Sequence, residues 1–269
     1  MGQAKHSRRA HLAVLQRMPY CIYCGGVEPA VTIDHMPPRI CFRWKHRPQG
    51  LEFPSCKICN EGASHADYVA GLVSRFYETD GGVGYPDELF NMYRSLPSNV
   101  PGLLEELKKP RGSEKIALNR LPANMRNGGL LNVSGPILSS HMEVFCPKLG
   151  LALHFDATKK VLTNAGGIAT RWFTNFELFT GDFPEDIKNI FQMPQTLVQG
   201  RKEVSDQFQY ASVRGDSDNL CAYFASFRLS FSVVAFVAQD RRLLENKEKS
   251  FSVISPADLK QKIVNLAKR

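Results

Sequence analysis

Two Cys-x-x-Cys pairs restrict the fold of this chain more than any other feature of its sequence. Cys21 and Cys24 form the first pair, Cys56 and Cys59 form the second, and 31 residues separate the pairs. Four thiolates can close a tetrahedral Zn²⁺ site that has no open coordination position, so this zinc would be structural. It would hold together a segment that is rich in proline and glycine and has little core of its own. Buried free thiols or a redox pair are the alternatives.

The composition is that of a globular protein without a membrane segment. The chain has 269 residues, 43% of them hydrophobic and 22% charged, which suits one large domain or two small ones. No segment reaches the roughly 18–20 apolar residues that span a bilayer, and the N-terminus lacks the apolar core of a signal peptide. We therefore expect a cytoplasmic protein with no membrane partner, in which clustered cysteines bind metal rather than form disulfides.

The positive charge is concentrated near the N-terminus. The chain has a formal net charge of +8, and residues 1–60 contribute most of it, with nine basic and three acidic residues. These basic residues are Lys5, Arg8, Arg9, Arg17, Arg39, Arg43, Lys45, Arg47 and Lys57. Such a concentration suits phosphate backbones, which supply most of the non-specific affinity for nucleic acids. A basic surface without a nucleic-acid partner is the alternative interpretation.

The hydrophobic pattern predicts an α+β fold. Short strands are expected at 31–35 and 51–54, and a helix is expected from residue 64, where apolar residues follow a helical spacing. Further helices are predicted at 87–96, 102–108, 114–125 and 256–269, and further strands at 149–155, at 207–213 and within 221–238.

This order of elements predicts three segments. Residues 1–80 are expected to form a zinc-stapled finger, 81–135 a helical connector, and 136–269 an α+β domain with an antiparallel sheet. The region beyond about residue 130 carries no motif that indicates its role, and binding of a protein partner is one candidate.

An acid and an imidazole, Asp34 and His35, stand next to each other at the end of the first predicted strand. Pro37 and Pro38 end that strand, so both side chains can face one cleft. A zinc between the cysteine pairs would bring Asn60 close to Asp34. Carboxylate and amide oxygens suit Mg²⁺ or Mn²⁺ better than Zn²⁺, and His35 beside such an ion could take a proton from an attacking water.

This constellation resembles the HNH, or His-Me finger, endonuclease family. The matching stretches are CIYC at 21–24, TIDHMPPR at 32–39 and PSCKICN at 54–60, followed by an amphipathic helix that ends near Tyr77. The resemblance implies a ββα-metal finger with a structural four-cysteine zinc. It also implies that His35 is the general base and that Asp34 and Asn60 hold one catalytic divalent ion.

Two positions in this segment bear on how closely the chain follows the family pattern. One departs from the pattern, and the other is a residue with two alternative roles. Many members have an Asn about five residues before the third cysteine, where it fixes the loop, and Gly50 and Leu51 occupy that place here. The loop must then be held otherwise, for which Gln49 is a candidate. His65 is a further candidate for a metal ligand or a phosphate contact, and an exposed helix residue is the alternative.

A basic and aromatic loop between the two predicted strands is the expected nucleic-acid contact. Around Trp44 it contains Arg39, Arg43, Lys45, His46 and Arg47. Phosphate oxygens accept hydrogen bonds from such side chains, and an exposed aromatic ring can stack on a base.

Two classes of function remain after this reasoning. The first is a metal-dependent endonuclease that hydrolyses phosphodiester bonds in DNA, and the resemblance extends this to a nuclease of antiviral defence or of a mobile element. The second is a zinc-stapled module that binds nucleic acid without catalysis. The second class requires neither His35 nor a divalent ion, whereas the joint presence of Asp34, His35 and Asn60 favours the first.

Overall fold

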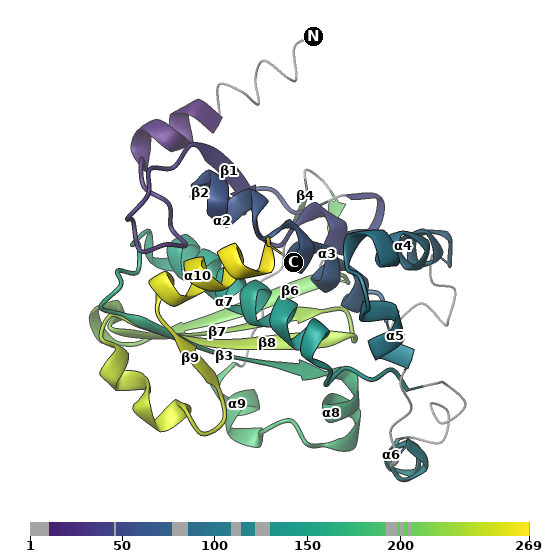
Figure 1. Cartoon of the computed structure of the whole chain (residues 1–269). Helices are drawn as coiled ribbons and strands as arrows, with labels where there is room; N and C mark the ends of the chain where they lie inside the picture. Colours follow the sequence, from purple (N-terminus) through teal and green to yellow (C-terminus); the bar gives the residue numbers. More distant parts are fainter. Residues whose placement is uncertain are drawn as a thin grey trace.

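A computed structural model describes residues 11–45, 47–76, 86–108, 114–121, 130–191, 198–199, 202–203 and 206–268. It confirms an α+β fold with antiparallel sheets. Figure 1 shows the chain in layers, with the N-terminal elements above a long central helix, a large sheet below that helix, and short helices under the sheet. No helix of the described part is both long enough and apolar enough to cross a membrane.

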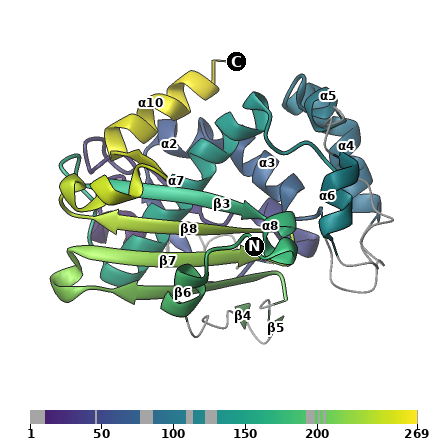
Figure 2. The same ribbon diagram turned by 90° about the horizontal axis from the view of Figure 1, so that it is seen from below.

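The large sheet has five antiparallel strands in the order β6-β7-β8-β3-β9. Their bounds are Gly167–Thr174 for β3, Phe208–Arg214 for β6, Leu220–Phe227 for β7, Phe231–Ala238 for β8 and Ser252–Ile254 for β9. Every residue of β8 is buried, because this central strand is covered on both faces (Figure 2). The predicted strands at 207–213 and within 221–238 are confirmed as β6, β7 and β8.

The central helix α7, Pro136–Thr158, lies across one face of this sheet (Figure 2). Proline at its first position suits a helix start, where the missing N–H would have no intrahelical partner. A carboxylate from α5, Leu103–Lys108, caps this end: Glu106 accepts hydrogen bonds from the N–H groups of Ile137 and Leu138, both at 2.8 Å. The capping anion also interacts favourably with the helix dipole.

The strand predicted at 149–155 is wrong, because these residues form the C-terminal half of α7. Leu149, Leu151 and Leu153 alternate with other buried residues, since α7 is enclosed by the sheet on one side and by helices on the other. A helix that is buried all round has no polar face, so its sequence loses the helical period and an alternation can arise by chance. At Gly150 the helix approaches the sheet so closely that a Cβ would lie 2.8 Å from the Cβ of Ala235.

The N-terminal elements pack on the opposite side of α7. Strands β1, Thr32–His35, and β2, Glu52–Ser55, form an antiparallel pair, as the sequence predicts. Helix α2, Lys57–Glu61, follows directly, and then α3, Ser64–Val73, which packs against α7. Helix α10 returns from the far end of the chain and contacts both α2 and α7 (Figure 1). Its bounds are Pro256–Leu266, within the predicted helix at 256–269.

The other elements surround these layers. Helices α4, α8 and α9 are at Pro86–Asn99, Asn175–Thr180 and Glu185–Ile190, and α6 is at Glu114–Arg120. Short 3₁₀ helices η1, η2, η4 and η5 are at Arg39–Cys41, Arg43–Lys45, Asp216–Asp218 and Arg241–Lys247, and a small pair β4-β5 is at Val198–Gln199 and Lys202–Glu203. Helices α4 and α5 confirm the helices predicted at 87–96 and 102–108. Helix α6 confirms the first part of the helix predicted at 114–125, of which 122–125 lie outside the described residues. A second core, which includes Phe173 and Phe183 with ring centroids 4.6 Å apart, covers the face of the sheet that α7 leaves open.

One continuous hydrophobic core joins the three predicted segments. It contains Ile22 and Phe53 from the first, Leu103 from the second, and Phe145 and Ile263 from the third. The N-terminal elements therefore share buried surface with α7 and α10. The predicted boundaries at 80/81 and 135/136 stay predictions.

The cap on α7 gives a stability prediction. In Glu106→Gln one of the two capped N–H groups would face an amide NH₂ in place of a carboxylate oxygen, and a buried donor without an acceptor costs about 1–2 kcal/mol. We therefore expect the free energy of unfolding in urea to fall by about 2 kcal/mol. Glu105→Gln, which changes the exposed neighbour in the same helix, is the control and should stay within about 0.5 kcal/mol of wild type. Equal stabilities of the two variants would show that the cap contributes little.

Candidate functional site

The structure brings the four predicted zinc ligands together. Cys21, Cys24, Cys56 and Cys59 are all buried, and their sulfur atoms all lie within 4.8 Å of one another. The thiolates around a tetrahedral zinc lie about 3.8 Å apart, so small side-chain movements would close the site. The cluster can thus hold a metal such as zinc. The other cysteines, Cys41, Cys146 and Cys221, are buried outside it.

Local sequence explains how each pair is presented. Two glycines follow Cys24, and both adopt the left-handed backbone that favours glycine, with φ of +72° at Gly25 and +74° at Gly26. The turn at these glycines reverses the direction of the chain after the first cysteine pair. In the second pair, Cys56 is the N-cap of α2, and its Sγ accepts a hydrogen bond from the N–H of Cys59 at 3.4 Å. A thiolate at that position benefits from the helix N-terminus.

The β1–β2 pair separates the cysteine cluster from His35. Thr32 pairs with Ser55 next to the cysteines, whereas His35 pairs with Glu52 at the far end. Helix α2 folds back over β1, and the amide NH₂ of Asn60 donates to Thr32 Oγ1 at 2.8 Å and to the carbonyl of Ile33 at 3.4 Å. These two hydrogen bonds hold the side-chain amide of Asn60 beside Thr32 and Ile33, the first two residues of β1.

The Asp34 carboxylate points into the protein and not into an open cleft. Only 4% of Asp34 is exposed, and its Oδ1 accepts a hydrogen bond from the N–H of His35 at 2.8 Å. Its Oδ2 lies 3.0 Å from Nζ of Lys148, a fully buried lysine of α7. The same Nζ lies 3.2 Å from Oδ2 of Asp67 on α3. Tyr23 completes this buried charge cluster, with Lys148 Nζ 5.5 Å from its ring centroid.

The charges in this cluster depend on one another. Burial alone would lower the pKa of Lys148, but the carboxylates of Asp34 and Asp67 raise it, so the lysine stays an ammonium. Burial raises the pKa of Asp67 to about 6, against the attraction of the ammonium. Tyr23 Oη and Asp67 Oδ1 have no hydrogen-bond partner among the described residues. The contact between Lys148 Nζ and Asp34 Oδ2 is an ion pair without good hydrogen-bond alignment.

Lys148, Asp67 and Tyr23 were not among the residues predicted for the site. One signal was available, since Lys148 is the single charged residue of the otherwise apolar stretch 144–155. A lone lysine in such a stretch needs buried anionic partners if the stretch is enclosed. Nothing in the sequence indicates which acids those partners are.

His35 lies at the end of β1 with its ring half-buried. Burial lowers the pKa of His35 to about 4, and the positive charge of Arg47 adds to this effect, with Arg39 contributing less. The imidazole is therefore neutral at pH 7. Its ring meets that of His11 edge to face, with centroids 6.3 Å apart. Glu52 lies directly across the strand pair.

The predicted nucleic-acid loop is partly at the surface. Arg39 is exposed, and the guanidinium of Arg43 lies 4.9 Å from the ring centroid of Trp44, whose side chain is 54% exposed. Arg47 is buried instead, because its Nη2 forms an ion pair with Glu52 Oε1 at 2.5 Å. His46 and the side chain of Lys45 lie outside the described residues. Contact of these five basic residues with nucleic acid stays a prediction.

Two arginines, the buried Arg75 and the partly buried Arg228, hold this loop in place. Arg75, at the end of α3, donates to the carbonyl of Phe42 at 3.2 Å and forms an ion pair with Glu88 at 3.1 Å. Arg228, in the turn between β7 and β8, donates to the carbonyl of Cys41 at 3.2 Å. The loop is thereby fixed from α3 and from the sheet. Gln49 is exposed, and its role in holding the loop stays a prediction.

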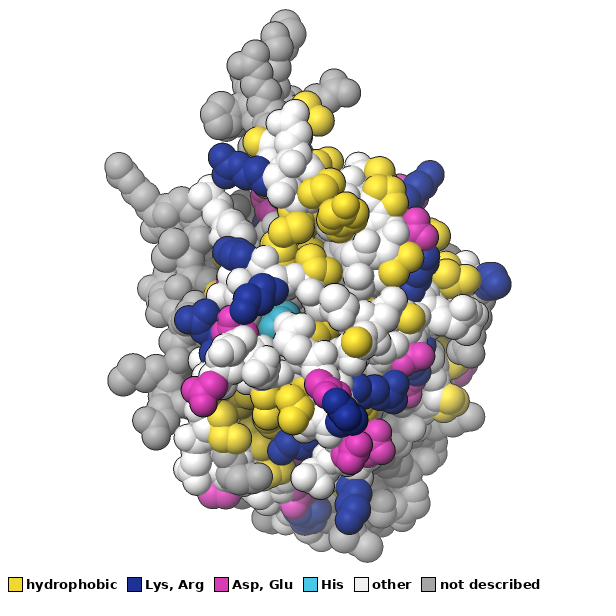
Figure 3. All heavy atoms as spheres, turned by 90° about the vertical axis from the view of Figure 1, so that its left-hand side faces the viewer, with side chains coloured by type: hydrophobic (Ala, Val, Ile, Leu, Met, Phe, Trp, Pro, Cys, Tyr) yellow, Lys and Arg dark blue, Asp and Glu magenta, His cyan; other side chains and the backbone are white. Residues whose placement is uncertain are grey.

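The surface around these elements is mixed. Figure 3 shows hydrophobic side chains gathered below the N-terminal end of the chain, with Lys and Arg side chains at their edges. Five large hydrophobic residues of the described part of residues 1–80 are more than half exposed: Leu12, Tyr20, Val27, Val31 and Trp44. The high positive charge of residues 1–60 therefore does not form one continuous basic face on this side.

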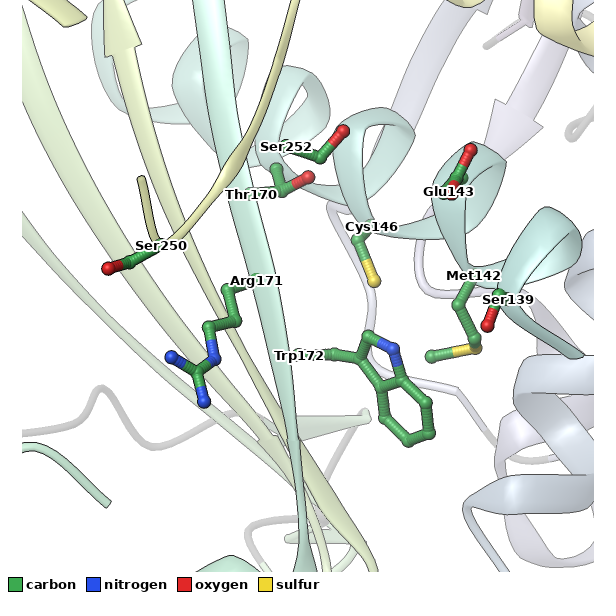
Figure 4. A pocket seen from close by; sticks show the side chains of 9 residues that line it. All are labelled: Ser139, Met142, Glu143, Cys146, Thr170, Arg171, Trp172, Ser250 and Ser252. Atoms are coloured by element: carbon green, nitrogen blue, oxygen red, sulfur yellow. The ribbon is translucent and has the colours of Figure 1, made fainter. Parts of the chain in front are cut away.

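A cavity of about 280 Å³ lies between α7 and β3, away from the cysteine cluster and His35. Its lining residues are Ser139, Met142, Glu143, Cys146, Thr170, Arg171, Trp172, Ser250 and Ser252. Figure 4 shows the indole of Trp172 between β3 and α7, pointing toward Met142 and Cys146, whereas Arg171 points to the other side of the strand. None of the predicted site residues lines this cavity.

Comparisons with known proteins gave no match to a family model, to a curated protein or to a solved structure. The resemblance to HNH endonucleases therefore stays a prediction. His65 lies exposed in the first turn of α3 and belongs to neither cluster of candidate metal ligands among the described residues.

The cysteine cluster predicts about one bound zinc per chain. Cys56→Ser should lose the metal and destabilise the protein, because three thiolates and a weak hydroxyl ligand hold zinc poorly. Metal content by mass spectrometry and thermal unfolding before and after chelation would measure both effects. Cys146→Ser, which changes a buried cysteine outside the cluster, is the control and should keep its zinc. Equal metal content in the two variants would contradict a four-cysteine site.

The buried charge cluster predicts a large loss of stability for Lys148→Met. Removal of the ammonium leaves two buried carboxylates without a counter-charge, which typically costs about 3–5 kcal/mol. Lys160→Met is the control, because Lys160 forms an ion pair with Asp218 at 2.9 Å and is 54% exposed, so the change should cost less than about 1 kcal/mol. Denaturant unfolding would compare the two variants. Similar small losses would show that the buried pair adds no stability.

Proposed function

We propose that this chain is an HNH-type endonuclease that hydrolyses phosphodiester bonds in DNA, with His35 as the general base. One observation carries the proposal. A neutral, half-buried His35 lies at the end of an antiparallel strand pair, and helix α2 behind that pair holds Asn60 and two of the four clustered cysteines. This order of elements is the one expected of a ββα-metal finger.

The environment of His35 suits a base that acts on water. A neutral imidazole has a lone pair that can accept a proton, and the low pKa keeps it in this form at physiological pH at the expense of basicity. Arg39 is exposed and close enough to lower that pKa, so a phosphate beside His35 would meet its positive charge, whereas Glu52 neutralises the charge of Arg47. Such charge would stabilise the negative oxygens that develop during attack on phosphorus.

The catalytic Mg²⁺ or Mn²⁺ that the resemblance implies fits the described residues incompletely. By residue type, Asp34 and Asn60 would hold it, and the ion would supply charge on the phosphate and the leaving oxygen. Lys148 already places an ammonium 3.0 Å from the Asp34 carboxylate, and a second cation beside it would be repelled. Binding of the ion to Asp34 would therefore compete with the ammonium of Lys148.

This ion pair favours the second candidate function. If Asp34 serves to anchor the strand pair to α7, the same elements form a zinc-stapled module that binds nucleic acid without cutting it. The exposed Arg39 and the Arg43–Trp44 stack would then be its contacts. A role in antiviral defence or in a mobile element rests on the resemblance alone, for either function.

Cleavage of plasmid DNA separates the two functions. With Mg²⁺ or Mn²⁺ present, wild type should nick or linearise the plasmid, and His35→Ala should be slower by about 100-fold or more, as expected for loss of a general base. DNA affinity in a gel-shift assay should stay unchanged, because the base acts chiefly in the transition state. Gln261→Ala, at an exposed residue of α10, is the control and should cleave at the wild-type rate. If His35→Ala cleaves as fast as wild type, the base assignment is wrong. If wild type binds DNA but does not cut it, the binding module is favoured.

A further inference from the structure

Three potential metal ligands from different segments meet at the end of the strand pair where His35 lies. His11 comes from the helical stretch 11–17, His35 from the last position of β1, and Glu52 from the first position of β2. Each offers one ligand atom, and these atoms all lie within 4.8 Å of one another. His11 Nε2 lies 4.0 Å from Glu52 Oε2.

The fold holds this cluster in place from two sides. His35 and Glu52 are direct partners across the strand pair, so their backbones have a fixed spacing. Arg47 binds Oε1 of Glu52 at 2.5 Å, which leaves the other carboxylate oxygen, Oε2, on the side of His11. Carboxylates that coordinate metals are commonly oriented by a hydrogen bond of this kind. All three ligand residues are half-buried, so water can reach the cluster and complete the coordination.

We propose that His11, His35 and Glu52 form a binding site for a divalent transition-metal ion such as Zn²⁺, separate from the four-cysteine site. Two imidazole nitrogens and one carboxylate oxygen are a donor set that Zn²⁺ and related ions prefer, whereas Mg²⁺ prefers oxygen ligands alone. Ligand atoms around a tetrahedral zinc lie about 3.4 Å apart. Rotation of the half-exposed side chains would close the 4.0 Å gap between His11 and Glu52.

This site is distinct from the groups discussed above. The four cysteines lie at the other end of the strand pair, and Asp34 faces Lys148 in the interior. The proposal does not rest on the endonuclease function, because it concerns binding and not cleavage. A zinc ion on the His35 nitrogen would occupy the lone pair that the proposed base needs, so zinc bound here would inhibit cleavage and the base role applies to the site without zinc.

Calorimetric titration of the zinc-loaded full chain with Zn²⁺ tests the site. In a buffer with millimolar Mg²⁺, wild type should bind one further equivalent, and mass spectrometry of the metal content should agree. His11→Ala and Glu52→Gln should each weaken this second binding by about tenfold or more. His65→Ala removes an exposed histidine from another element and should leave it unchanged. Thermal unfolding of each variant confirms that the fold is intact and that the cysteine-bound zinc is retained.

Three results would overturn the proposal. The first is a wild-type protein that takes up no second equivalent of Zn²⁺. The second is unchanged affinity in folded His11→Ala. The third is equal weakening in His65→Ala and His11→Ala, which would indicate scattered surface binding in place of a built site. Because no cleavage is measured, failure of the endonuclease proposal would leave these outcomes unaffected.

Discussion

The ammonium of Lys148 connects the N-terminal elements β1 and α3 to the central helix α7. It lies 3.0 Å from Asp34 on β1 and 3.2 Å from Asp67 on α3, and it belongs to the central helix α7. An isolated ammonium inside a protein is strongly unfavourable, so α7 can be enclosed at this point only if both carboxylates are in place. The cluster thereby fixes how the cysteine-bearing strand pair sits on the rest of the chain.

The same contact shapes the candidate site. Because Asp34 turns inward to Lys148, the side chains near His35 are His11, Glu52 and Arg47 rather than the acid next to it in sequence. The two ends of one short strand pair thus have different chemistry. Four thiolates lie at one end, whereas two imidazoles and one carboxylate lie at the other. Adjacent strand residues point to opposite faces, which is the physical reason that Asp34 and His35 diverge.

Two arginines give the basic loop a defined position. Arg75 and Arg228 are far apart in sequence, yet both donate to carbonyl groups of residues 41–42. The loop would otherwise carry unsatisfied carbonyls next to the core. Arg39 and Trp44 are presented at the surface as a result, while Arg47 is drawn inward by Glu52. The basic residues of this loop, which look alike in the sequence, therefore differ in role: Arg47 is held in a buried ion pair, whereas Arg39 is exposed.

The sequence by itself determined the local features: the α+β class, the short strands before and after the loop, the helix at 64, the antiparallel strands near the C-terminus and the four cysteines that cluster. These depend on spacing, turn residues and one-sided hydrophobic patterns, which neighbouring residues set. Tertiary structure alone decided that 149–155 is helical, that Asp34 pairs with Lys148, and that His11 and Glu52 join His35. A helix enclosed on all sides has no polar face to reveal its period, and partners for a buried charge come from segments that only the fold brings together.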